Sequence, residues 1–421
     1  MKKLFALMLA MVLVLGLVGC GKDDKKVINF WHLHVDETSW ERQTINAFIK
    51  DFEAAHPDFK VVQHPLYDDD YKNKLYTEFT GTAESIDVFT YWGAGRAGEI
   101  VKNGKMLCID DYLTPEQRNS LKPGVDYNFV YEGGKLYGIP TYSWMMVLFI
   151  NTEMFDERNL AYPETFDQWM TAVKAFAAEG IEPLALGGGM DDAWQAAFIV
   201  EAMVNRFVGA KTEDEMLNGG AGREGAMFRK AGEAVVALNK AGAFGPSPLE
   251  ESESMANTIF LSGASPMRLT GSWIVGSVYD DPDSVVAGKV KALPIPSVVG
   301  GDGLATDYKG GFIDGIYVNK ATKYPEVCAE FAYNIAVALA TGSHSQGQGF
   351  TAFNLPVDES KLTPLGVEVA GIAKKMELGI VAWDTFLDQD VAEIHLMICQ
   401  QLLKDNDVDA FVREYGNGVF K

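Results

Sequence analysis

The sequence predicts an α/β protein with two domains, and three features of the chain lead to this prediction. Its 421 residues exceed what one ordinary hydrophobic core can serve. A composition of 48% hydrophobic and 11% aromatic residues is typical of a globular protein with a sizeable core. Short apolar runs alternate with stretches of helical periodicity, a pattern that favours helices packed on a mostly parallel sheet.

The first part of the chain shows this alternation clearly. The apolar run 27–31 predicts a strand, and the spacing of Ile45, Phe48, Ile49 and Phe52 predicts one buried helix face. The alternation continues with expected strands at 60–63 and 86–92 and an expected helix at about 70–80.

The rest of the chain follows the same pattern. Thr165 and Gln168 form a capping-box pattern that predicts a helix through Phe176. Pro325 suits the first turn of another helix. Further strands are expected at 145–151, 183–186, 267–269, 290–294 and 313–319, and further helices at 193–207, 225–241, 365–378 and 391–404.

The N-terminus is typical of a secretory signal. Two lysines precede the apolar run 4–18, which at about 15 residues is shorter than the roughly 20 that a spanning helix needs. The run ends in Leu17-Val18-Gly19-Cys20, which resembles the lipobox of bacterial lipoproteins. That resemblance implies a signal peptide at 1–19 and a lipid on the thiol of Cys20. The polar residues 20–26 suit a flexible tether, and an uncleaved membrane anchor is the alternative.

Charge and cysteine content exclude several classes of protein. A net charge of -22 repels phosphate backbones, so we expect no nucleic-acid partner. Besides Cys20, the chain has Cys108, Cys328 and Cys399, an odd and widely spaced set that does not suggest a disulfide framework. Cys328 and Cys399 fall in helical patterns and are expected in the core. No CxxC pair indicates zinc or redox chemistry, and we expect no cofactor.

Several segments, in order, carry a resemblance to a known family. They are 28–32, 86–89 with 92–93, 135–140 with 148–151, 163–169, 271–273 and 310–312. Behind the lipobox, this set resembles the extracellular solute-binding proteins of ABC importers. It is most similar to their carbohydrate-binding branch, which includes maltose-binding protein.

The resemblance implies a periplasmic-binding-protein-like fold, in which two α/β lobes joined by a hinge close on a ligand. The first lobe would comprise 27–139 and 313–352, and the second 140–309 and 353–421. Hinges are expected near 140–142 and 308–312. The protein would be an anchored extracytoplasmic monomer that captures a sugar or oligosaccharide and delivers it to ABC permease subunits.

Sugar chemistry indicates which residues to expect in the cleft. Sugar rings have apolar C–H faces that stack on aromatic rings, and their hydroxyls need convergent polar groups. Trp273 follows Gly271-Ser272, where its position matches a stacking tryptophan of the family. The expected ligand-binding residues are Trp273, Trp92, Tyr142, Trp144, Asp314, Trp383, Asp384, Trp194, Asp191, His34, Glu37 and Arg96. For these tryptophans the alternative is core packing, and for an aspartate beside a helix start it is capping.

Other functions remain open from the sequence. An acidic, aromatic cleft also suits a cation such as a polyamine, or a peptide. His32 and His34 could serve a metal importer, although two histidines without nearby partners are more often structural. An anchored glycosidase would need paired carboxylates, which composition alone does not identify, and the chain contains no hydrolase motif.

Overall fold

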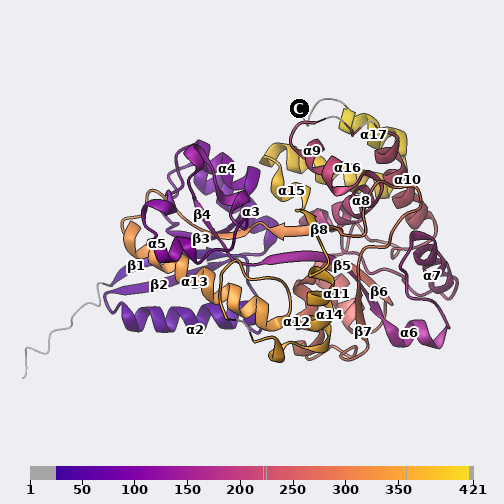
Figure 1. Cartoon of the computed structure of the whole chain (residues 1–421), viewed down its shortest axis with the longest axis horizontal. Coiled ribbons are helices and arrows are strands. Elements are labelled where there is room, and N and C mark those ends of the chain that lie inside the picture. The colour runs from indigo at the N-terminus through magenta and orange to yellow at the C-terminus, as the bar shows by residue number, and fades with distance from the viewer. Residues whose placement is uncertain (1–24, 221, 224, 357, 417–421) are drawn as a thin grey trace, which may run out of the picture.

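The computed structural model describes residues 25–416 except 221, 224 and 357, and Figure 1 shows two lobes side by side. The expected signal peptide at 1–19 and the expected lipid site, Cys20, lie outside the described residues. Of the expected tether, only the last two residues are described, and Lys26 already belongs to the first strand.

A five-stranded sheet forms the core of the first lobe, in the order β2-β1-β3-β9-β4. β1 is parallel to β2 and β3, whereas β9 is antiparallel to β3 and β4. The strands are β1 (Lys26–His32), β2 (Phe59–Pro65), β3 (Val88–Trp92), β4 (Gly138–Pro140) and β9 (Asp314–Val318). The helices of this lobe are α2 (Trp40–Ala55), α3 (Asp68–Thr80), α4 (Ala94–Lys102), α5 (Pro115–Asn119) and α13 (Pro325–Gln346).

The second lobe is built around one long strand, β5 (Ser143–Asn151), in which every residue is buried. β6 (Met267–Gly271) pairs with one edge of β5, while β8 (Asp307–Phe312) and β7 (Val290–Leu293) pair with the other. All three are antiparallel to β5, and β10 (Leu378–Ile380) runs parallel to β8. The expectation of a mostly parallel sheet was therefore wrong for this lobe. The reason is that the chain runs into this lobe along β5 and runs back out along the neighbouring strand β8, so the two strands have opposite directions.

Helices surround this second sheet. They are α6 (Thr152–Glu157), α7 (Phe166–Ala178), α8 (Ala193–Val208), α9 (Ala210–Leu217), α10 (Ala226–Lys240), α11 (Glu253–Leu261), α12 (Val275–Asp280), α14 (Pro364–Ala373), α15 (Trp383–Phe386), α16 (Gln389–Asp405) and α17 (Val408–Gly416). The capping box of Thr165 and Gln168 at α7 is confirmed, as is Pro325 in the first turn of α13.

The strand expected at 183–186 does not form. Pro183 has no backbone N–H, and the chain bends at Pro183 and Leu184. The segment instead makes separate hydrogen bonds, from Leu184 N to Ala243 O at 2.9 Å and from Ala185 N to Met267 O at 3.1 Å. It therefore lies beside β6 without extending the sheet.

The chain crosses between the lobes twice, each time through two consecutive strands, and Figure 1 shows β5 and β8 of these crossings at its centre. β4 continues into β5 through Thr141 and Tyr142, and β8 continues into β9 through Ile313. Gly310 and Gly311 in β8 have φ values of 136° and 145°, which favour glycine. A Cβ on Gly310 would also overlap the carbonyl oxygen of Trp144 in β5. The two crossing strands can therefore approach closely only because of this glycine.

The part of the chain that the structure describes contains no helix long and apolar enough to cross a membrane. Cys108, Cys328 and Cys399 are free thiols there, and the last two are fully buried, as expected from their helical patterns.

Replacing Gly310 with alanine should lower the free energy of unfolding by at least about 1 kcal/mol, because the new Cβ meets the backbone of β5 at an unfavourable φ. Urea unfolding followed by circular dichroism measures this. The matched control is Gly371→Ala in α14, where no atom lies within 4 Å of the new Cβ. That change should stabilise the helix by up to about 1 kcal/mol, and equal losses in the two variants would contradict the account.

Candidate functional site

A cavity of about 290 Å³ lies between the two lobes, and residues from both sheets and their helices line it. Its lining consists of Leu33, His34, Glu41, Tyr67, Asp68, Lys72, Trp92, Tyr142, Trp144, Trp194, Phe198, Glu253, Trp273, Ser277, Asp314, Ala382, Asp384 and Thr385. Eight residues expected at the site from the sequence are among them: His34, Trp92, Tyr142, Trp144, Trp194, Trp273, Asp314 and Asp384.

Four aromatic side chains form the second-lobe side of the cavity, here called the aromatic wall: Trp144, Trp194, Phe198 and Trp273. Trp144 stacks on Phe198 with ring centroids 5.5 Å apart. Trp273 meets Trp144 at 5.4 Å and Trp194 at 5.7 Å, each time edge to face. Because every ring packs against others, the wall presents fixed apolar faces to the cavity.

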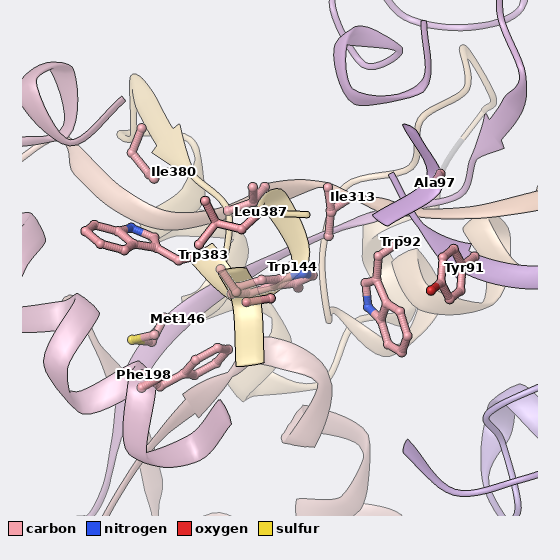
Figure 2. Packing of buried hydrophobic residues seen from close by; sticks show 14 of the residues in the cluster. Tyr91, Trp92, Ala97, Trp144, Met146, Phe198, Ile313, Ile380, Trp383 and Leu387 are labelled. Carbon is pink, nitrogen blue, oxygen red and sulfur yellow. The ribbon is translucent and has the colours of Figure 1, made fainter. Parts of the chain in front are cut away.

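The aromatic wall comes from three elements. Trp144 is on β5, Trp194 and Phe198 are one turn apart on α8, and Trp273 is in the 3-10 helix η5 (Ser272–Ile274) directly after β6. Figure 2 shows Trp144 with Phe198 on one side and Trp92, from the first sheet, on the other. Aromatic rings from both lobes therefore face the same space.

Polar groups of the first lobe and the crossover lie opposite the aromatic wall: His34, Glu41, Tyr142 and Asp314. His34 follows β1, Glu41 is in the first turn of α2, and Asp314 begins β9. Burial raises the pKa of Glu41 and of Asp314 to about 7. Burial, with the nearby Arg42, lowers the pKa of His34 to about 4. Near neutral pH His34 is therefore uncharged, and Glu41 and Asp314 are only partly ionised. All three side chains can still form hydrogen bonds.

A chain of charges connects the lobes at one end of the cavity. Lys72 on α3 lies 2.8 Å from Asp68 and 3.8 Å from Asp384, with its ammonium 5.1 Å from the ring centroid of Trp92. Arg96 on α4 lies 3.5 Å from the carboxylate of Asp384 and donates to its backbone oxygen at 2.8 Å. Since Asp384 belongs to α15 of the second lobe, these bonds join α3 and α4 to that lobe.

Four residues expected to bind ligand do not line the cavity. Glu37 points into solvent, with its side chain 80% exposed and 3.7 Å from Arg42. Asp191 is exposed in the 3-10 helix η4 (Met190–Asp192), and Arg96 is buried behind Asp384. Trp383 is only 1% exposed, and its indole donates to Glu213 at 2.7 Å.

The structure also adds residues that the sequence did not reveal. Phe198 could have been found, because it lies four residues after the expected Trp194, on the same helix face, whereas Lys72 follows Asp68, which was not among the expected residues. Glu41 and Glu253 lie in first helical turns, where acids are common without any ligand. In the described residues, no group of three or more His, Cys, Asp or Glu side chains is placed to hold a metal ion.

Comparison with known proteins is consistent with this geometry. The sequence profile of bacterial extracellular solute-binding proteins matches residues 38–338. The chain belongs to this family. It is 26% identical over 304 residues to an uncharacterised ABC transporter extracellular-binding protein of Pyrococcus horikoshii, a match that covers 70% of this chain and 67% of that relative.

Solved structures of this family share the fold. One, from work on xylan utilisation by the thermophilic bacterium Caldanaerobius polysaccharolyticus, has 28% identity and a TM-score of 0.88, and the match covers 93% of this chain and 99% of that one. A chitin oligosaccharide binding protein has 20% identity and a TM-score of 0.83, with coverage of 93% and 97%. The expected fold and family are confirmed, and the chain is an extracellular solute-binding component of an ABC transporter.

The raised pKa of Asp314 predicts a pH dependence. Between pH about 4 and about 7 the folded protein keeps a proton that the unfolded chain has released, so this residue contributes stability at low pH that is lost as pH rises. The side chain of Asp314→Asn is an amide, which does not titrate and stays neutral over this pH range. Its melting temperature should therefore rise relative to the unmodified protein between pH 4 and pH 8. Ser277→Ala, which changes a non-titrating residue of the same cavity, should run parallel to the unmodified protein, and parallel curves for Asp314→Asn would contradict this.

Proposed function

We propose that the chain captures an uncharged sugar or short oligosaccharide in this cavity and delivers it to the permease of an ABC importer. The observation that carries the proposal is the pairing of the aromatic wall with half-buried polar groups opposite it. Sugar C–H faces suit the wall, and sugar hydroxyls suit His34, Glu41 and Asp314. The cavity of about 290 Å³ is near the lower end of the roughly 300–1,000 Å³ usual for small-molecule sites.

The similar proteins support a carbohydrate ligand. The structure with 28% identity comes from work on xylan utilisation, and another is named for binding chitin oligosaccharides. A solute-binding protein in complex with raffinose, 17% identical, shares the fold with a TM-score of 0.74. Capture would proceed by closure, in which a ligand that touches both lobes favours the closed form.

The placement of the protein in the cell is part of the same proposal. Residues 1–19 would be removed as a signal peptide, and a lipid on Cys20 would hold a monomeric body at the outer face of the cell membrane. The lobes would comprise 27–139 with 313–352 and 140–309 with 353–421. Gly310 and Gly311 would take up the change in backbone angle at closure. The chain would capture its ligand without transforming it.

A cationic solute such as a polyamine is the second candidate. The observation that favours it is the number of acids that line the cavity next to aromatic rings: Glu41, Asp68, Glu253, Asp314 and Asp384. Asp68 and Asp384 lie beside Lys72, and burial raises the pKa of Glu41, Glu253 and Asp314 to about 7, which makes a neutral ligand the better match at neutral pH.

A thermal-shift panel separates the two candidates. Xylo-oligosaccharides, chitin oligosaccharides, raffinose, spermidine and putrescine would each be added to the purified body of the protein. At least one neutral sugar should raise the melting temperature, by an amount that grows with the logarithm of its concentration relative to its Kd, since it binds only the folded state. If only a polyamine stabilised the protein, the carbohydrate proposal would fail.

The same panel run on Trp273→Ala tests where the ligand binds. Loss of one ring of the aromatic wall should weaken sugar binding about tenfold or more, because an aromatic contact of this size contributes over 1 kcal/mol. The matched control is Tyr127→Ala, which removes a 72% exposed ring outside the cavity lining and should leave affinity intact.

A further inference from the structure

Two carboxyl groups hold two of the three indole rings of the aromatic wall: Glu253, which also lines the cavity, and Asp192, which does not. Trp194 Nε1 donates to Asp192 Oδ1 at 3.3 Å, and Trp273 Nε1 donates to Glu253 Oε1 at 3.1 Å. The backbone N–H of Glu253 donates to Asp192 Oδ2 at 2.9 Å. The two acids therefore form one hydrogen-bonded unit, and each one orients a tryptophan.

The surroundings of Asp192 make this unit rigid. Asp192 is 1% exposed and ends η4 immediately before α8, while Glu253 begins α11. Arg268 on β6 is fully buried, donates to Ala185 O at 3.0 Å and supplies a positive charge toward both acids. An acceptor fixed in this way holds an indole N–H more firmly than water would.

A residue of the opposite lobe reaches the same oxygen atom. Tyr67, which precedes α3 in the first lobe, donates its hydroxyl to Asp192 Oδ1 at 3.3 Å. Tyr67 also lines the cavity, whereas Asp192 does not. Asp192 Oδ1 thus accepts hydrogen bonds from the first lobe and from the aromatic wall.

We propose that Asp192 is a positioning residue that couples closure of the lobes to the orientation of Trp194 and, through Glu253, of Trp273. Docking of Tyr67 on Asp192 completes the set of hydrogen bonds that fixes both rings in their ligand-binding positions. This inference rests on the proposed function for its effect on affinity, and on the hydrogen bonds alone for its effect on the rings.

A double-mutant cycle tests the coupling, with xylotriose as the probe and calorimetry as the measurement. Tyr67→Phe should weaken binding about tenfold, as loss of one hydrogen bond to a carboxylate does, and Asp192→Ala, which removes all three bonds that Asp192 accepts, should weaken it at least as much. The double variant should be no weaker than the poorer single variant, because both changes break the same bond. Asp192→Asn, which keeps an acceptor oxygen, should recover part of the affinity. Additive losses would overturn the proposal.

A readout without ligand keeps this test separate from the carbohydrate proposal. In protein labelled with ¹⁵N-tryptophan, Tyr67→Phe should shift the indole N–H resonance of Trp194, which a Trp194→Phe variant identifies. The control is Tyr162→Phe, which removes a surface tyrosine-to-aspartate hydrogen bond of 2.9 Å to Asp156 and should leave that resonance in place. An unmoved Trp194 resonance in Tyr67→Phe would overturn the inference. If the unmodified protein bound no sugar while the resonance moved, the proposed function would fail and the coupling would stand.

Discussion

The ammonium group of Lys309 is fully buried in the second lobe, between Glu201 at 2.9 Å and Glu213 at 2.7 Å. A buried charge that loses its partner costs about 3–5 kcal/mol, so α8 and α9, which carry these acids, are held against β8. His395 on α16 bonds Glu201 at 3.0 Å. Burial lowers the pKa of His395, whereas the neighbouring Cys399 and Glu201 raise it, to about 10.

The cavity depends on this buried cluster through Trp383. Its indole donates to Glu213 and its backbone N–H to Glu201, so the short helix α15 is fixed to the core of the second lobe. Its neighbours Ala382, Asp384 and Thr385 are thereby presented to the cavity, and Asp384 meets Lys72 on the cavity side and the buried Arg96 behind it. Lys309 also directly precedes the two glycines of the crossover, so the buried charges set the geometry of both the site and the connection between lobes.

Local patterns predicted much of the fold, and topology explains most of what they missed. The capping box at Thr165 and the buried run of β3 follow from neighbouring residues alone. The antiparallel course of β5 depends on a partner more than 100 residues away, which no local pattern contains. The tryptophans show the same limit. Trp273 and Trp383 both follow a short strand, yet one faces the cavity and the other pairs with buried acids whose positions the sequence does not reveal.

We propose that an uncharged sugar occupies the space between the aromatic wall and the acids opposite it. A crystal structure of the protein body grown with xylotriose tests this most directly. We expect a sugar ring stacked on Trp273, with hydroxyls hydrogen-bonded to Glu41 or Asp314. A cavity that remains free of sugar at saturating xylotriose and instead holds a cationic molecule carried through purification would contradict it.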